Sequence, residues 1–387
     1  MQFILKKDEI SRLKVFNSYL KNMNNCAALK KEQLFVVRNN KLSVYGSGSS
    51  GNITADFDVD SNDTFVFTFE FSQFLNFIDK VNSDETTITF NDSKLIFTGS
   101  NTGAKYSQVV LNTIEETAKA DMAAMDDFTT SNAYNNAVTI TLDDDIKETI
   151  ANMSSMANLL NCNKFIKIVD DGVVTVDNVS IIKKSLTINT NGQEFYLLRS
   201  VSPLLKDASD IKICNLYSSD EYFDTYIYLD ISSLGIKLWF VEPPVDFQIP
   251  KDEEIAEMSP TDDSASIIEI NSEDFFNCIE KFEGVFDSAS WKYKQIKFDF
   301  DETDTSKVLI HYDNMVSEIQ DELPIANVEQ NKISSSLFLI PTLHMKYLKE
   351  DLLKEGSFKF KFDFSDEHFI THVQNSFLDA ALTKVEG

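Results

Sequence analysis

Two short segments of the sequence have residue types and spacings that could support chemistry. The segment GSGSSG at 46–51 matches the Gly-x-Gly-x-x-Gly pattern of dinucleotide sites, in which a helix must follow so that its N-terminus meets the pyrophosphate. The strand-like ITADFDV follows instead, which favours a hairpin loop. The segment DDD at 143–145 could bind a divalent cation, but carboxylates are also typical of a helix start, where the helix dipole stabilises them. We expect the helix start.

Histidine and cysteine supply no stronger candidate. His368 and His372 lie four residues apart, a spacing that suits a metal pair on a helix, but the surrounding DEHFITHV is typical of a strand. The sequence has 4 His, and no Ser/His/Asp or Cys/His arrangement has local support. We therefore expect no metal, no cofactor and no enzymatic activity.

Lysines in the first predicted helix suggest a different kind of chemistry. Lys7, Lys14 and Lys21 are seven residues apart, so they share one stripe of the helix that is predicted near residues 8–23. The other side of that helix carries Ile10, Leu13, Phe16 and Leu20. A lysine stripe suits weak attraction to nucleic acid phosphates. The alternative is an ordinary solvated helix surface.

Composition limits these possibilities. The chain has 387 residues and a net charge of -27, so most of its surface should repel nucleic acid. DNA binding therefore requires basic residues gathered on one face, and the alternative is that the charge serves solubility. The 4 Cys are far apart, which favours buried thiols in a reducing compartment. The start MQFILKKDEI lacks a signal-peptide core, and no apolar run is long enough to span a membrane, so we expect a cytoplasmic protein.

The elements that position these residues recur along the chain. A short strand leads into a helix six times, and the helix starts are about 55–74 residues apart, which indicates one supersecondary unit used repeatedly. The fourth helix is short because Pro203 interrupts it. The predicted helices lie near 8–23, 70–82, 144–160, 199–208, 272–286 and 341–355.

Polar segments and alternating strands predict the domains and the fold class. The stretches 112–136 and 250–266 look like linkers, which divides the chain into domains 1–125, 126–255 and 256–387. Phe65, Phe67 and Phe69 alternate with less apolar residues, as in a strand with one buried face. Runs of such strands broken by single helices predict an α+β architecture with helices on one sheet face.

Six strand–helix units in three domains, with this length and acidity, resemble the bacterial-type DNA polymerase III β sliding clamp. MQFILKKDEISRLKVF is similar to the opening strand and helix of that family, and KLSVYGSGSSGNITADF to the following hairpin. IKETIANMSSMANLLNCNKFIKI resembles the helix that opens its second domain, and VDFQIP the stretch that closes it. LIPTLHMKYLKE and NSFLDAALTKVEG resemble its last unit. The resemblance covers nearly the whole chain at low identity.

The resemblance implies a non-enzymatic processivity factor in DNA replication. Three clamp domains would form half of a closed ring, a head-to-tail homodimer whose sheet edges pair across subunits, with twelve helices lining a pore around double-stranded DNA. The DNA would be held without sequence preference. The pore-facing residues would be Lys7, Lys14, Lys21, Gln73, Asn76, Lys80, Lys147, Asn158, Arg199, Lys206, Asn277, Lys281, Lys346 and Lys354.

The same resemblance implies a pocket between the second and third domains for short peptides of the DNA polymerase and the clamp loader. Its lining would be Ile166, Val179, Ile181, Phe247, Pro250, Leu378 and Leu382, and the alternative for each is plain core packing. The segment 178–180 (NVS) replaces the family's Gly-His-Arg, and the family's Met-Pro-Met ending is missing. A phage or viral member acting in a host cytoplasm would fit such divergence.

Two other classes compete with the clamp. An acidic structural or interaction protein, such as a virion component or a DNA mimic, would not encircle DNA. A mimic would concentrate acidic residues on the helical faces, whereas Lys7, Lys14 and Lys21 lie there instead. A distant enzyme is the third possibility, and it lacks a catalytic constellation.

Overall fold

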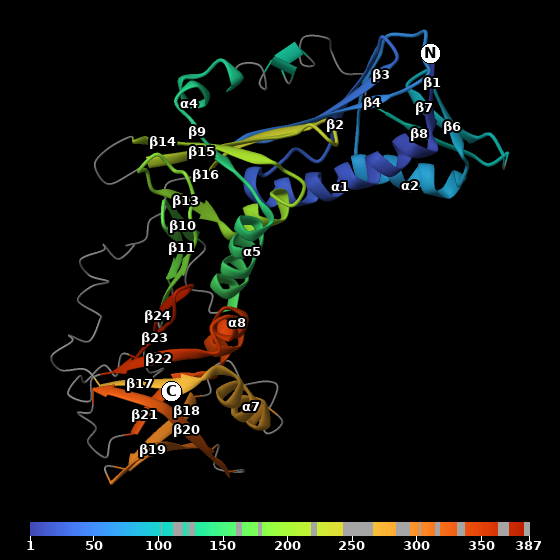
Figure 1. Ribbon diagram of the computed structural model, residues 1–387. Helices are drawn as coiled ribbons and strands as arrows, with labels where there is room; N and C mark the ends of the chain where they lie inside the picture. The colour runs from blue at the N-terminus through green and yellow to red at the C-terminus, as the bar shows by residue number, and fades with distance from the viewer. Residues whose placement is uncertain are drawn as a thin grey trace. The chain divides into compact units, whose positions relative to one another are not determined.

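The computed structural model describes residues 1–101, 103–110, 119–120, 122–123, 128–159, 165–176, 180–217, 223–242, 266–283, 295–301, 303–313, 318–330, 337–362 and 371–382 (Figure 1). The chain separates into two compact units. Unit 1 comprises Met1–Lys147, Asn189–Asn191 and Ser200–Val245, and unit 2 comprises Glu148–Ile188, Gly192–Arg199 and Asp246–Gly387.

Each of the six predicted strand–helix pairs is present, because an alternating apolar strand is followed in each case by an amphipathic segment. The fourth helix is a short 3-10 helix that contains Pro203, as expected from the missing amide hydrogen of proline. The pairs are β1 (Gln2–Lys6) with α1 (Lys7–Ala27), β5 (Phe65–Phe69) with α2 (Phe71–Val81), β9 (Val138–Thr141) with α5 (Asp144–Leu159), β13 (Phe195–Leu198) with η1 (Arg199–Leu204), β17 (Ser266–Asn271) with α7 (Ser272–Glu283), and β21 (Leu337–Pro341) with α8 (Thr342–Leu353).

Three strands follow every pair, so the chain is built from six modules of the order strand, helix and three strands. Modules 1 and 2 continue with β2 (Gln33–Arg38), β3 (Lys41–Ser47), β4 (Gly51–Asp58), β6 (Glu85–Asn91), β7 (Lys94–Gly99) and β8 (Lys105–Val109). Modules 3 and 4 continue with β10 (Phe165–Val169), β11 (Gly172–Val176), β12 (Ser180–Ser185), β14 (Asp210–Tyr217), β15 (Phe223–Ile231) and β16 (Ile236–Glu242). Modules 5 and 6 continue with β18 (Gln295–Asp301), β19 (Asp304–Asp313), β20 (Glu318–Gln330), β22 (Ser357–Phe362), β23 (Thr371–Gln374) and β24 (Leu378–Leu382).

The strands form antiparallel sheets within each unit. Unit 1 contains the sheets β5-β2-β3-β4-β16-β15-β14-β9 and β1-β6-β7-β8. Unit 2 contains one sheet with the order β13-β10-β11-β12-β24-β23-β22-β17-β20-β19-β18-β21. Modules far apart in sequence meet at two antiparallel pairs: the first seam, where β4 pairs with β16, and the second seam, where β12 pairs with β24. The fold is therefore α+β, as the sequence predicts.

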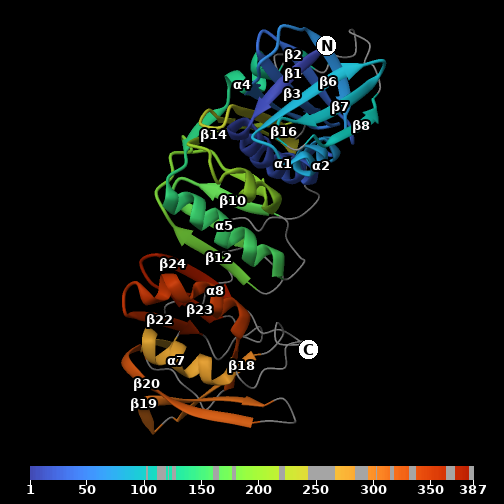
Figure 2. The ribbon, with the colours of Figure 1, turned by 90° about the vertical axis from the view of Figure 1, so that its right-hand side faces the viewer.

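Aromatic side chains fill the core between helices and sheets in unit 1. Phe16 of α1 lies edge-on to Phe57 of β4 and Phe71 of α2, with ring centroids 5.8 and 5.2 Å apart. Phe35 stacks on Phe67 of the neighbouring strand at 4.7 Å. Figure 1 shows α1 and α2 side by side below the strands of unit 1. In unit 2, α7 and α8 likewise lie on one face of the strands (Figure 2).

A buried ion pair spans the second seam. The ammonium of Lys184 on β12 lies 2.6 Å from the carboxylate of Asp351 on α8, and the two side chains are 7% and 9% exposed. Lys354, in the turn after α8, also contacts Asp351 at 2.9 Å. Burial alone would raise the pKa of Asp351, but its contacts with Lys184 and Lys354 outweigh that effect, so the pKa lies below its ordinary value.

The C-terminal part of the predicted linker 112–136 is packed against module 4. Phe128 is 6% exposed and belongs to an apolar cluster with Ala133 and Tyr228. The short helix α4 (Asn132–Asn135) follows, and the Ser131 hydroxyl caps it by accepting a hydrogen bond from the Tyr134 amide at 3.2 Å. The sequence stretch is polar overall, so its few apolar residues gave too weak a signal to predict this packing.

Two further expectations concern membranes and thiols. None of the described helices is long and apolar enough to cross a membrane. Cys26, Cys214 and Cys278 are free and buried, in agreement with the expectation of buried thiols, and Cys162 lies outside the described residues.

Candidate nucleic-acid interface

The lysine stripe of α1 is exposed, and carboxylates on neighbouring residues balance part of it. The Lys7 ammonium lies 3.3 Å from Asp84, and the Lys14 ammonium lies 2.8 Å from Asp79 on α2. All four of these side chains are more than half exposed, so each ion pair is weak and easily exchanged. Lys21 is exposed and has no ion-pair partner among the residues that the structure describes.

The polar face of α2 continues this surface within unit 1. The side-chain amide of Gln73 donates to Glu70 at 3.0 Å, and Asn76 is exposed. Lys80 is exposed, and its ammonium lies 5.4 Å from the ring centre of Phe77 and 5.6 Å from that of Tyr106. These three residues therefore lie on the solvent face of α2, as the helical periodicity predicts.

A basic hollow lies beside the C-terminal half of α1. It has a volume of about 310 Å³, and its lining includes Lys21, Lys30 and Lys31 together with Asn17 and Asn24. Three ammonium groups with neighbouring amides suit an anion such as a phosphate. The sequence prediction missed Lys30 and Lys31 because they follow the helix, although the adjacent pair of lysines was a visible signal.

Backbone geometry at the end of α1 sets the position of this hollow. Ala28 adopts a left-handed conformation with a φ of 45°, and its amide donates to the Asn24 carbonyl at 3.2 Å, which ends the helix. The Lys30 amide then donates to the Ser47 carbonyl at 2.8 Å. A Cβ on Gly48 would lie 2.1 Å from the Ala27 carbonyl oxygen, so only glycine allows this close approach.

Glu70 forms the acidic rim of the hollow. Its carboxylate lies 3.2 Å from the Lys31 ammonium and accepts a hydrogen bond from the Ser72 hydroxyl at 2.7 Å. The Ser72 hydrogen bond, followed by the contact with Lys31, lowers the pKa of Glu70. An anion that entered the hollow would therefore compete with Glu70 for Lys31.

The remaining predicted pore residues come from elements of both units. Lys147 is half-buried on α5, and Asn277 is exposed on α7. Lys281 of α7 forms an ion pair with Asp321 of β20. Two positions correct the prediction that these lysines lie on helices, because Lys206 and Lys354 are exposed in the turns that follow η1 and α8. Asn158, Arg199 and Lys346 lie in α5, η1 and α8, but their side chains are outside the described set.

The residues predicted to line a peptide pocket are only partly described. Ile166 on β10 and Leu378 on β24 are 1% and 0% exposed. The strand register puts both on the sheet face that also carries Ile182 and Lys184, whereas Ile181 lies on the opposite face. Val179, Phe247 and Pro250 lie outside the described residues, and Leu382 is in β24 with its side chain undescribed. The pocket remains a prediction.

The other motifs fold as structural features. The segment 46–51 comprises the end of β3, the turn at 48–50 and the first residue of β4. Asp143 caps α5 by accepting a hydrogen bond from the Ile146 amide at 2.8 Å. His372 is buried in β23 with its Nδ1 3.1 Å from Asp379, whereas His368 lies outside the described residues. Within the described ranges, no group of three or more His, Cys, Asp or Glu is placed to hold a metal ion.

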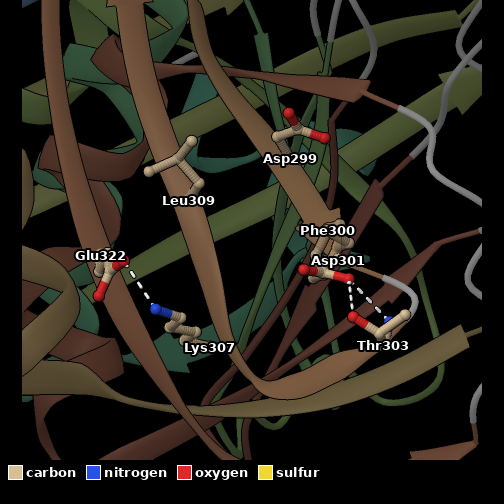
Figure 3. Close-up of a pocket in the computed structure, with 7 residues that line it drawn as sticks. All are labelled: Asp299, Phe300, Asp301, Thr303, Lys307, Leu309 and Glu322. Atoms are coloured by element: carbon tan, nitrogen blue, oxygen red, sulfur yellow. Dashed lines mark hydrogen bonds and ion pairs between the residues drawn. The ribbon is translucent and has the colours of Figure 1, made fainter.

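An acidic hollow on the β18–β20 strands was not predicted from the sequence. Figure 3 shows its residues, which surround a volume of about 600 Å³. Its charged groups already have local partners: Lys307 lies 2.7 Å from Glu322, and Asp301 accepts hydrogen bonds from Thr303, which lower its pKa. These contacts are typical of an exposed sheet surface and its turns.

Six modules in antiparallel sheets, with amphipathic helices on one sheet face, define the sliding-clamp class of α+β fold. No family model matches the sequence, and no curated protein matches it. Solved structures do match. The DNA polymerase III subunit beta from Pseudomonas aeruginosa has a TM-score of 0.68 at 11% identity, with 100% of both chains covered.

Two further solved structures are similar to the same extent. The DNA polymerase sliding clamp from Bacillus subtilis has a TM-score of 0.67 at 10% identity, with 100% of this chain and 99% of that chain covered. The Helicobacter pylori beta clamp bound to a DNA ligase peptide has a TM-score of 0.66 at 11% identity, with 100% of both chains covered. The chain therefore has the fold of the DNA polymerase III β clamps along its whole length.

Proposed function

We propose that this chain is a DNA sliding clamp, a ring that encircles duplex DNA, tethers the replicative DNA polymerase and so confers processivity. The observation that carries the proposal is the likeness of its fold, over the full length, to polymerase clamps. A ring holds DNA by topology, so it needs only weak attraction to phosphates without base readout. Its role is to tether, without catalysis.

The distribution of lysines in unit 1 supports contact with DNA despite the net charge of -27. The lysines of α1 and the basic hollow are exposed, and nearby carboxylates moderate their attraction to phosphate. A DNA mimic is disfavoured because it would carry acidic residues on the solvent face of α1, where Lys7, Lys14 and Lys21 lie.

We infer three domains, 1–125, 126–255 and 256–387, each made of two modules. The strand pairing suggests how two chains would close a ring. The first seam joins the last strands of modules 1 and 4, and the second seam joins the last strands of modules 3 and 6. In both seams the paired modules are three apart in chain order. Counting three modules on from module 5 gives module 2 of a second chain. The ring would therefore close where β20 of one chain pairs with β8 of its partner.

The chemistry of these two strands favours that pairing. In the described structure β8 pairs with β7 alone, and residues 318–324 of β20 pair with β19 alone, so each strand has a free edge. Lys105 and Val109 of β8 are exposed, Val109 by 64%, and Glu322 of β20 is also exposed. Pairing would cover Val109 and bring opposite charges together.

Analytical ultracentrifugation with charge variants tests the ring. We expect a dimer at micromolar concentration, weakened by Lys105→Glu and at least partly restored when Glu322→Lys is added. Lys41→Glu, on the interior strand β3, is the matched control and should leave the dimer intact. A wild-type chain that sediments only as a monomer would contradict the ring.

Retention on DNA tests encirclement directly. After loading, we expect the protein to stay on circular duplex DNA and to leave the same DNA once it is linearised. Lys21→Glu with Lys31→Glu should weaken the association and reduce the slope of its salt dependence by about one per lost phosphate contact. Equal retention on circular and linear DNA would refute encirclement.

We also propose that short peptides of the polymerase and the clamp loader bind the pocket predicted from the sequence. The solved Helicobacter pylori clamp holds a DNA ligase peptide, which supports peptide binding by this fold. A variant with Phe247→Ala and Leu382→Ala that still folds should lose binding of a polymerase peptide. Unchanged affinity would remove this assignment without affecting the ring.

A further inference from the structure

The segment between the first two proposed domains carries an aromatic anchor. The Phe128 ring stacks on Trp239 of β16, with centroids 4.5 Å apart and planes inclined by 5°. Tyr134 lies edge-on to Tyr228 of β15 at 5.0 Å, and its hydroxyl accepts a hydrogen bond from Lys212 of β14 at 2.9 Å. The aromatic anchor therefore fixes residues 128–134 to three strands of module 4.

A second, aliphatic anchor precedes it in the chain. Met122 packs against the cluster formed by Leu34 and Val36 of β2, with Tyr45 and Val66 beside it. These residues come from β2, β3 and β5, which belong to modules 1 and 2. The aliphatic anchor thus holds the segment to strands that precede it, whereas the aromatic anchor holds it to strands that follow it.

The two anchors lie on the same face of one sheet, on either side of the first seam. Leu238 and Phe240 are fully buried on the face that α1 covers, so the intervening Trp239 points to the opposite face. Phe35 and Val37 of β2 are also fully buried on the helix-covered face of the sheet. Leu34 and Val36, which alternate with them, therefore point to the same face as Trp239. Figure 1 shows α4 on the other side of these strands from α1. The first seam, β4 with β16, lies between the anchored groups of strands.

We propose that the two anchors, Met122 and residues 128–134, together act as a strap that holds the first seam closed. Without the anchors, the connection between β8 and β9 would have 28 residues, from 110 to 137. In the sequence only five residues, 123–127, separate Met122 of the aliphatic anchor from Phe128 of the aromatic anchor. The probability that a flexible connection brings its ends together falls as roughly the three-halves power of its length, so the strap favours seam closure about tenfold.

Lengthening the sequence between Met122 and Phe128 tests the strap while leaving both anchors in place. Ten Gly/Ser residues inserted between Ala124 and Met125 should lower the protection of first-seam amides in Gly51–Ala55 and Ile236–Phe240 about fivefold in hydrogen exchange. Amides of the β2–β3 pair should not change. The same insertion between Asn101 and Thr102, in the β7–β8 connection, is the matched control and should leave the seam protected.

A second variant tests the anchors themselves. Met122→Ser with Phe128→Ser should lower first-seam protection about tenfold. Adding the insertion to this double variant should have little further effect, because without the anchors the whole β8–β9 connection already separates the two groups of strands. Unchanged seam protection in the insertion variant, or equal loss in the control insertion, would overturn the strap. Both measurements use the chain without DNA or loader, so they are independent of whether the clamp function holds.

Discussion

The Lys184–Asp351 ion pair gives a prediction that can be worked from the structure. Lys184→Met removes the positive charge from a site in which both side chains are less than a tenth exposed. Asp351 would then rely on Lys354, whose side chain is 52% exposed and partly screened by water. Loss of one partner of a buried pair costs about 3–5 kcal/mol, and the remaining lysine puts the expected cost near the lower end, at about 3 kcal/mol.

Hydrogen exchange at the second seam measures this cost locally, which matters because the two units need not unfold together. Protection of the amides in 181–184 and 378–382 should fall about a hundredfold in Lys184→Met. The double variant Lys184→Met with Asp351→Leu should recover most of the loss, because an apolar pair avoids the buried charge. A single variant as stable as the wild type, or a double variant no better than the single, would refute this reasoning.

The same pair predicts a dependence on pH. The pKa of Asp351 lies below its ordinary value of 3.8, so the ion pair contributes its full stability above about pH 3.8. That contribution is lost as the pH falls through the lowered pKa. The stability that Lys184→Met loses relative to the wild type should therefore be largest above about pH 3.8 and shrink below it, because the wild-type pair loses its contribution there and the variant has none to lose; urea unfolding of unit 2 at a series of pH values would detect this. A stability difference that does not change with pH would contradict the assignment.

Three other substitutions have expected outcomes. Gly51→Ala should disrupt the first seam, because its Cβ would lie 2.4 Å from the Trp239 carbonyl oxygen; urea unfolding of unit 1 should shift by more than about 2 kcal/mol. Arg12→Met removes hydrogen bonds to the carbonyl oxygens of Asp56 and Leu234, at 2.9 and 3.0 Å, and should cost about 2 kcal/mol in the same assay. Tyr19→Phe removes a 2.9 Å hydrogen bond to Asp207 and should cost about 1 kcal/mol, with no change in secondary structure by circular dichroism.

The module order could be predicted from the sequence because each strand and helix buries one face. Phe65, Phe67 and Phe69 are nearly fully buried, as their alternation predicts, and the six strand–helix pairs lie where the periodicity puts them. Pairing between distant modules could not be predicted in this way. Local periodicity gives the buried face of a strand and says nothing of which strand lies beside it.

The candidate interface was predicted less completely, for a related reason. Lys7, Lys14 and Lys21 share a helix, so their exposure follows from spacing alone. Lys30 and Lys31 join Lys21 in the basic hollow only because the chain turns at Ala28 and runs beside β3. The carboxylates of Asp79 and Asp84 come from a different element, so no helical wheel of α1 could show that they balance its lysines.

The carboxylates beside the α1 lysines affect how easily the proposed clamp would slide along DNA. Under the proposed function, a phosphate that reaches Lys7 or Lys14 replaces an ion pair the lysine already had, with Asp84 or Asp79. The free energy of the contact is then only the difference between a lysine–phosphate pair and a lysine–carboxylate pair. The lysine–carboxylate pair re-forms when the phosphate leaves. Successive phosphates would cross such a surface over shallow barriers, so translocation along the duplex should depend less on salt than the number of exposed lysines suggests.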